Sequence, residues 1–321
     1  MSVRAFTWRG LAVLVALLLA VGCATQPKQQ PEADDSYGVL LMAHGGSKEW
    51  NERVLAAVEP LRDRYTIEVA FGMADAASLQ EAVSKLEAQG VRQIGVVRLF
   101  ISGESWYERT RKILGLVPGA PQRVVSAHDA HANHGQHAQH SMAFWQVDTA
   151  ASFALSEEGL ADAKEMDAIL LERVSRLSRD PASEDVLILA HGPGDDAENT
   201  RWIEKISSRA AAVRTQPFRR VEVHTLREDW PEKREAAERT VRAFVERANE
   251  ENGRAIVVPF RVGGFGPYAK VLNGLDYVAD GLGLLPHPNV TKWIERQIET
   301  LEVAHRTERV VAGAAVQAGA R

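Results

Sequence analysis

The sequence predicts an α/β fold of two similar modules, each a parallel sheet with helices on both faces. Two observations predict it. Short apolar segments alternate with longer segments of helical periodicity, which is typical of β-α-β units. In addition, an apolar run ending in Ala-His-Gly occurs twice, with its histidine at His44 and again 147 positions later at His191. A helical segment follows both, so we expect each histidine at the carboxyl end of a buried strand, where open α/β sheets bind ligands.

The first module is predicted to contain three strands and three helices. The strands are the apolar segments Tyr37–Met42, Thr66–Phe71 and Gln93–Ile101. The helices are the periodic segments Lys48–Arg64, Ser78–Gln89 and Trp106–Leu114. Ser78 followed by Glu81 resembles a capping box at the start of the second helix, and Gly90 suits its end.

The second module repeats this order. Its expected strands are Asp185–Ala190, Val221–Leu226 and Ala255–Phe260, and its expected helices are Asp196–Val213, Glu232–Asn252 and Tyr268–Ala279. A helix over Lys164–Leu177 precedes it, and the polar, proline-bearing segment Asp180–Glu184 favours a boundary there. We therefore assign residues 37–180 to the first module, 181–303 to the second and 304–321 to a tail.

The first 22 residues have the form of a secretory signal. Arg4 and Arg9 precede an apolar run, Leu11–Val21, that is too short to span a bilayer. The run ends at Leu19–Cys23, which resembles a bacterial lipobox whose cysteine becomes the lipidated first residue. Residues 23–36 are a polar tether. We expect a lipoprotein anchored outside the cytoplasm, in the periplasm or at the cell surface; an uncleaved anchor and an ordinary signal remain alternatives.

Composition excludes several classes of site and partner. Cys23 is the only cysteine, so the exported part can hold neither an internal disulfide nor a multi-thiolate metal site. The net charge of −5, without a basic stripe, argues against a nucleic-acid partner.

An ordered set of motifs gives the chain a family resemblance. In the first half these motifs are Val39–Gly46, Phe71–Asp75, Ser78–Ala82, Gly90 and Val96–Gly103, and in the second half Ala190–Gly192, Ile256–Phe260 and Leu282–Pro288. Together they resemble two sirohydrochlorin cobaltochelatase modules of the class II chelatase superfamily. The resemblance implies a flavodoxin-like bilobal fold with a cleft for a tetrapyrrole, into which a divalent metal ion (Co, Ni or Fe) is inserted without ATP.

Metal insertion needs a ligand for the ion, a base for two pyrrole protons, and cations that meet the tetrapyrrole's carboxylates. Neutral imidazole meets the first two needs, so His44 and His191 are the candidate catalytic and metal-binding residues. Members of the resembled family place a second metal-binding histidine shortly after the third strand, where this chain has Gly103–Trp106 and Gly264–Pro267. Glu104 is the candidate to replace that histidine, either as a metal ligand or as a base. The alternative is that its side chain is only solvated at the surface.

Four further residues are candidates for binding the tetrapyrrole. Arg98 and Arg261 lie at or near the same strand end of their respective repeats. A guanidinium can bind a carboxylate through two parallel hydrogen bonds, so both arginines are candidates for binding the carboxylates of the tetrapyrrole. The alternative is that both are simply solvated at the surface. Gly263 and Gly264 have no Cβ, so the backbone there can lie close to a flat macrocycle. The alternative is that they form an ordinary tight turn. Their spacing fits no nucleotide-binding fingerprint, so we expect no nucleotide.

A histidine-rich segment, residues 128–140, belongs to the first module. Five imidazoles recur at an interval of three: His128, His131, His134, His137 and His140. Such a tract can bind Ni, Zn, Cu or Co with little geometric selection, or it can be a solvated low-complexity loop.

Two classes of function follow from these residues. One is an enzyme that inserts metal into a tetrapyrrole. The other is a binding protein that holds a metal ion or a finished tetrapyrrole in the same cleft, since the second family histidine is replaced.

Membrane tethering through Cys23 can be tested by cell fractionation. Cys23→Ser removes the sulfur that would carry lipid, so we expect the variant to move from the membrane fraction to the soluble fraction. Unchanged membrane association of the variant would reject lipidation.

Overall fold

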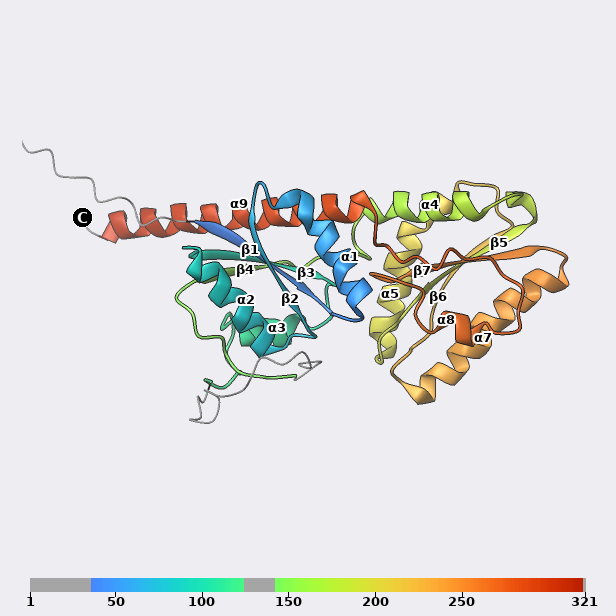
Figure 1. Cartoon of the computed structure of the whole chain (residues 1–321), viewed down its shortest axis with the longest axis horizontal. Helices are drawn as coiled ribbons and strands as arrows, with labels where there is room; N and C mark the ends of the chain where they lie inside the picture. Colours follow the sequence, from blue (N-terminus) through green and yellow to red (C-terminus); the bar gives the residue numbers. More distant parts are fainter. Residues whose placement is uncertain (1–35, 124–141, 320–321) are drawn as a thin grey trace, which may run out of the picture. The chain divides into compact units, whose positions relative to one another are not determined.

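The computed structural model describes residues 36–123 and 142–319, and its first sheet carries the first Ala-His-Gly segment. Four parallel strands pair in the order β2-β1-β3-β4 (Figure 1). Their bounds are β1 Tyr37–Ala43, β2 Thr66–Phe71, β3 Gln93–Leu99 and β4 Ser152–Leu155. β1, which leads to His44, is central, with partners on both sides.

The second sheet repeats this arrangement with three strands in the order β6-β5-β7. The strands are β5 Glu184–Ala190, β6 Arg220–Thr225 and β7 Arg254–Phe260, all parallel. β5, which leads to His191, again lies between two partners. The predicted α/β fold with two parallel sheets flanked by helices is confirmed.

Nine α-helices lie within the described residues. They are α1 Lys48–Val58, α2 Ala76–Ala88, α3 Tyr107–Ile113, α4 Glu165–Leu177, α5 Asp196–Arg209, α6 Ala211–Arg214, α7 Pro231–Glu250, α8 Tyr268–Val271 and α9 Pro288–Gly319. The capping box predicted at Ser78 is wrong by three residues: Asp75 is the N-cap of α2, and its side chain accepts a hydrogen bond from the Ser78 backbone N–H. Gly90, at φ 85°, ends that helix as predicted.

Alternate residues along the central strands divide the apolar core into three clusters. On β1, Leu40 and Met42 face a cluster with α2 and α3, whereas Val39, Leu41 and Ala43 face the opposite side. On β5, Leu187 and Leu189 face a cluster with α7 and α8. The remaining faces of both sheets share one continuous cluster, which includes Val39 and Val186. Because side chains alternate across a strand, each buried strand contributes to two clusters.

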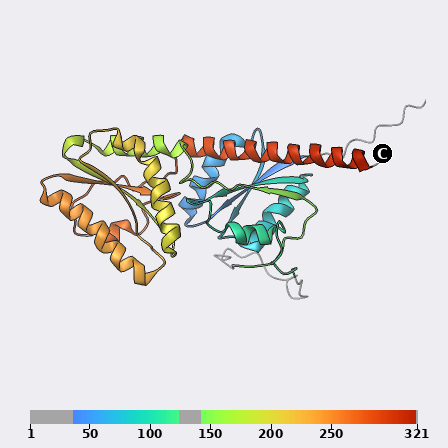
Figure 2. The same ribbon diagram turned by 180° about the vertical axis from the view of Figure 1, so that it is seen from behind.

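Helices α4 and α9 do not follow the boundary that the sequence favours between the modules. α4, assigned to the first module, contacts α6 and β7 of the second half. α9, most of which was assigned to the second module, contacts β3, β4 and α1 of the first half. Figures 1 and 2 show α9 in red along the first sheet and α4 along the second. Each module is therefore completed by a helix from outside its own βα repeats.

Two segments differ from the predicted elements. The helix expected over Tyr268–Ala279 ends at Val271, and Gly274, at φ 82°, lies in the turn that follows. Val278 then exchanges backbone hydrogen bonds with β7, its N–H donating to Ala255 O at 2.8 Å, because the edge of β7 offers partners. β4 was not predicted; it occupies the corresponding edge of the first sheet.

Within the described ranges, no helix combines the length and the apolar character that crossing a membrane requires.

The packing of α9 can be tested with two substitutions on that helix. Trp293 is fully buried in the shared cluster, so Trp293→Ala is expected to lower the free energy of unfolding by about 3–5 kcal/mol. Val303 is 62% exposed, so Val303→Ala is expected to change it by less than about 0.5 kcal/mol. Guanidinium unfolding measures both, and equal effects of the two would contradict the packing of α9 described above.

Candidate functional site

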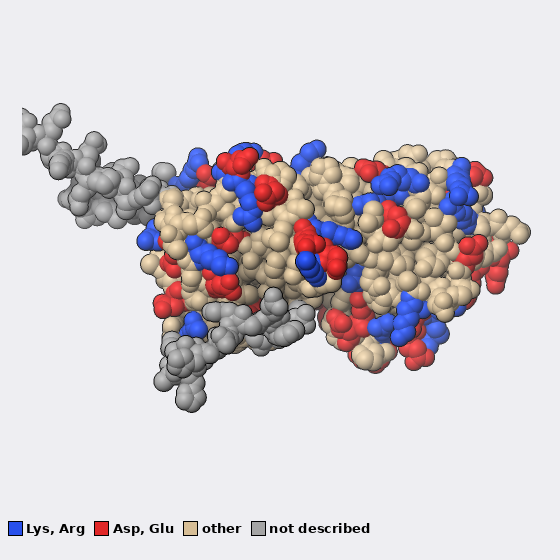
Figure 3. Space-filling view, viewed as in Figure 1, with Lys and Arg blue, Asp and Glu red and all other residues tan. Residues whose placement is uncertain are grey.

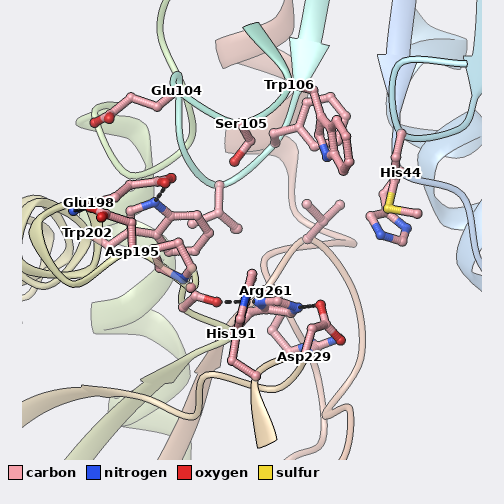
Figure 4. A pocket seen from close by; sticks show the side chains of 18 of the residues that line it. His44, Glu104, Ser105, Trp106, His191, Asp195, Glu198, Trp202, Asp229 and Arg261 are labelled. Carbon is pink, nitrogen blue, oxygen red and sulfur yellow. Dashed lines mark hydrogen bonds and ion pairs between the residues drawn. The ribbon is translucent and has the colours of Figure 1, made fainter. Parts of the chain in front are cut away.

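A cleft of about 840 Å³ lies where the carboxyl ends of β1 and β5 meet loops of both halves of the chain. From the first half it is lined by the His44 turn, by Trp50 of α1 and by the loop after β3. From the second half it is lined by the His191 turn, the start of α5 and the loops after β6 and β7. Figure 4 shows His44 and His191 entering this cavity from different strands. The structure thus brings together the two predicted histidines.

The two imidazoles are held in the same way. Nδ1 of His44 lies 2.8 Å from the carbonyl oxygen of Gly45, and Nδ1 of His191 lies 2.7 Å from that of Gly192. Since a carbonyl oxygen only accepts, Nδ1 must carry the proton in these hydrogen bonds. A neutral imidazole held so has its lone pair on Nε2, which is the form that binds a metal ion or takes up a proton.

His191 has a carboxylate partner in the cleft. Its Nε2 lies 3.0 Å from Oδ2 of Asp229, which is 71% exposed, and its ring meets the Trp230 ring edge to face. An imidazole that donates from both nitrogens is positively charged. A proton taken up at Nε2 of His191 would therefore be met by an exposed carboxylate, through which it can pass to solvent.

The walls of the cleft are aromatic, which the sequence analysis missed. Four of the seven tryptophans line it, together with Phe100: they are Trp50, Trp106, Trp202 and Trp230. Comparing the two repeats could have predicted part of this wall, because Trp50 and Trp202 each belong to the helix that follows a His-Gly turn. Large flat side chains around one cavity suit a flat apolar ligand.

Trp106 lies at this wall in an unusual backbone conformation. Its φ of 59° is in the left-handed region, directly before α3. A bulky residue adopts this region only when its surroundings require it, and such residues concentrate at functional sites.

Glu104 lines the cleft but is already engaged across it. Its two carboxylate oxygens accept from Arg201 of α5, at 2.9 Å from Nε and 2.5 Å from Nη2. These hydrogen bonds are the largest cause that holds the pKa of Glu104 below its ordinary value. A carboxylate with a lowered pKa is a weaker base, so Glu104 is better suited to joining the two halves than to accepting pyrrole protons.

Further ion pairs from α5 continue this connection. Lys205 Nζ lies 2.9 Å from Asp162 Oδ1, and Arg209 Nη1 lies 3.1 Å from Asp167 Oδ1. Arg201, Lys205 and Arg209 are spaced four residues apart, so they share one face of the helix. Lys205 therefore adds a second ion pair to the loops of the first half, whereas Arg209 holds α5 to α4.

Arg98 lies outside the cleft lining and does not face a ligand site. It is 1% exposed, its Nε donates to Ser156 O at 2.9 Å, and its Nη groups donate to Gly103 O and Ser105 O at 2.6 and 2.8 Å. Burial lowers its pKa to about 10, which still leaves it charged at neutral pH. Its role is to hold the loop that carries Glu104 and Trp106.

The other predicted binding residues are placed differently. Arg261 and Gly263 line the cleft, whereas Gly264 is not part of the lining. Arg261 donates to Glu228 through Nη1 and lies over the Tyr268 ring at 5.5 Å. A Cβ added to Gly263 would lie 3.1 Å from the Trp50 ring, so this glycine permits a close approach of the two halves.

The histidine tract 128–140 and Cys23 lie outside the described residues. Among the residues that are described, no group of three or more His, Cys, Asp or Glu side chains is arranged to hold a metal ion. Figure 3 shows acidic and basic side chains interspersed on the face it draws, without an extended patch of one sign.

Comparisons with known proteins agree with this fold. The CbiX family model matches residues 38–147. SirB from Bacillus subtilis, solved with Fe³⁺, has a TM-score of 0.56 at 13% identity, over 82% of this chain and 94% of that one. The sirohydrochlorin chelatase SirB from Bacillus subtilis subspecies spizizenii, in complex with cobalt, has a TM-score of 0.52 at 12% identity, over 83% and 97%. At these identities the likeness shows the fold. Comparison with curated protein sequences finds no match.

The ion pair between Glu104 and Arg201 predicts a coupling that depends on pH. The folded pKa of Glu104 is lowered, so the pair stabilises the protein above the ordinary value of 4.5 and is lost as the pH falls through the folded pKa. Since both side chains are partly exposed, we expect the coupling to be small at neutral pH and to weaken further as salt is added.

A double-mutant cycle of Glu104→Gln and Arg201→Gln, followed by urea unfolding from neutral to acidic pH, measures this coupling. Glu104→Gln combined with Arg239→Gln is the control, because Arg239 pairs with Glu235 on its own helix, and its coupling should be zero. A Glu104–Arg201 coupling that persists unchanged in strong acid would contradict the assigned pair.

Proposed function

We propose that this chain, whose residues 38–147 match the CbiX family model, acts as a class II chelatase and inserts a divalent metal ion into a tetrapyrrole bound in the cleft. One observation carries the proposal. His44 and His191 enter one aromatic-walled cavity from equivalent strand ends, each with Nδ1 turned to a backbone carbonyl.

The arrangement accounts for the two tasks of metal insertion. The divalent ion, which is a substrate, needs a nitrogen donor that holds it and gives it up, and Nε2 of His44 has this character. The macrocycle releases two protons from its pyrrole nitrogens as the ion enters. His191 suits the uptake of these protons, because Asp229 stabilises the imidazolium and is exposed enough to pass a proton to water.

The tryptophans and Phe100 have a different role in this proposal. Their flat faces hold the macrocycle by apolar contact, independently of the histidines. Substrate binding and chemistry are therefore expected to depend on different residues.

A second candidate function is binding without chemistry. It is favoured by one observation: Glu104, which stands where the resembled family has a second histidine, is held by Arg201 through both carboxylate oxygens. In that case the same cleft would hold a metal ion or a finished tetrapyrrole.

Two further proposals rest on the sequence alone. Lipid on Cys23 would anchor the protein to a membrane outside the cytoplasm, and the histidine tract 128–140 would bind divalent ions loosely. Both segments lie outside the described residues.

Mixing the purified protein with sirohydrochlorin and Co²⁺ tests the proposal, with insertion followed by the absorbance of the macrocycle. We expect insertion faster than the spontaneous rate. His44→Ala should lower the catalysed rate by about 10²–10⁴-fold, because it removes a group that acts in the transition state. His191→Ala should lower it less, since water can replace a proton acceptor more readily than a metal ligand.

Tetrapyrrole binding, followed by tryptophan quenching, should survive both substitutions. His287→Gln is the control, because His287 pairs with Glu172 outside the cleft lining and should leave the rate unchanged. Tight binding of the tetrapyrrole or the metal ion without faster insertion would favour the binding protein over the enzyme. Binding of neither would contradict both functions and leave only the assignment of the fold.

A further inference from the structure

A second cavity, which we call the side pocket, lies at the free edge of the second sheet. It has a volume of about 410 Å³ and is lined by the end of β6 and by residues of α5 and α7. β6 is the edge strand of its sheet, and α5 and α7 pack on opposite faces of that sheet. Ala236 and Ala237 of α7 have small side chains, so the space between the two helices stays open.

The side pocket adjoins the cleft at the first turn of α7. Glu232 and Lys233 belong to that turn, and both residues line the cleft as well as the side pocket. An arm of a ligand bound in the cleft therefore needs only to pass Lys233 to enter the side pocket.

Arg227 lines the side pocket but not the cleft, and it is only 8% exposed. Its Nε donates to Pro193 O, and its Nη2 donates to Gly194 O and, at 2.9 Å, to Asp196 Oδ1. Within the described part of the chain, Nη1 of Arg227 has no hydrogen-bond partner. A donor left over on a buried guanidinium is costly, so an acceptor bound in the side pocket would be stabilised there.

Two other side chains offer donors to the same space. Lys233 Nζ donates to Asp196 Oδ1 at 2.7 Å, which leaves further hydrogens of the ammonium for a ligand. Asn199 Oδ1 accepts from Thr225 Oγ1 at 2.7 Å, and within the described ranges the Nδ2 group of Asn199 has no partner. Guanidinium, ammonium and amide donors thus line one cavity.

The charges around the side pocket balance. Arg227 and Lys233 are offset by Asp196, which is 77% exposed, and by the exposed Glu232. His224 also lines the pocket, but its Nε2 is paired with Glu222 at 2.9 Å. Recognition of an anion there depends on directed hydrogen bonds and not on an excess of positive charge. A planar carboxylate, which has two oxygens that accept, suits planar guanidinium and amide donors.

We propose that the side pocket binds a carboxylate group through Arg227 Nη1, Lys233 Nζ and Asn199 Nδ2. The carboxylate is either an arm of a macrocycle held in the cleft or a free small acid. The first source rests on the proposed function, since it concerns the tetrapyrrole of the same cleft, whereas the second does not.

Two forms of one porphyrin test the first source: one with propionate arms and one with these arms converted to primary amides. Binding is measured by tryptophan quenching. We expect the acid form to bind the wild-type protein about fivefold or more tightly than the amide form, because only the carboxylate forms charge-assisted hydrogen bonds with these donors.

Lys233→Gln and Asn199→Asp should each lower this ratio of affinities several-fold. The first removes a charged donor, and the second replaces the amide donor by a carboxylate while keeping the oxygen that accepts from Thr225. Lys85→Gln and Asn273→Asp make the same changes of charge at exposed positions outside the lining of both cavities, so they should leave the ratio unchanged.

Free propionate tests the second source, with its binding followed by the broadening of its own NMR signals. A lowered porphyrin ratio in the Lys233 and Asn199 variants supports the site with a macrocycle arm as its ligand. An unchanged ratio, with propionate broadening that both variants reduce, supports the site with a free acid as its ligand.

The carboxylate site would be overturned if neither variant changed the porphyrin ratio or the broadening of propionate. Failure of both porphyrins to bind would contradict the proposed function alone, because propionate still tests the side pocket by itself.

Discussion

The apolar cluster shared by the two sheets is the constraint on which the rest of the structure depends. Val39 on β1 and Val186 on β5 belong to the same cluster, and Trp293 of α9 is buried within it. Burial of a large apolar surface is the main driving force of folding, so the two halves cannot separate without exposing it. Their central strands are thereby held with both carboxyl ends at one cleft, and two histidines 147 positions apart become parts of one site.

The two halves keep the same backbone plan and differ at the cleft. After β3, Leu160 N–H donates to Phe100 O; after β7, Leu284 N–H donates to Arg261 O in the same manner. The side chains on this common plan differ, since the first half contributes Glu104 where the second has Phe265. The two sheets therefore supply similar frames, and the unlike residues on them allow one histidine to have a carboxylate partner, Asp229.

Two arginines near the site hold its loops. Arg98 holds the loop after β3 by backbone oxygens, and Arg227 holds the turn after His191 through Pro193 O and Gly194 O. A guanidinium has several donors in a fixed plane, so it can satisfy several carbonyls of an irregular loop at once. These contacts fix the course of the loops that line the cleft.

The sequence by itself determined the class of fold, the central strands and the position of the two histidines, because these depend on local periodicity and on a repeated Ala-His-Gly. The sequence also predicted that Gly90 ends α2, because a positive φ depends on the local residue type. It could not determine that α4 and α9 cover sheets outside their own repeats, because which face a helix covers depends on contacts distant in sequence. The roles of Arg98 and Glu104 were likewise decided by the tertiary structure. A charged side chain near a strand end binds a ligand only if no protein group meets it first, and here Ser156, Gly103 and Arg201 do so.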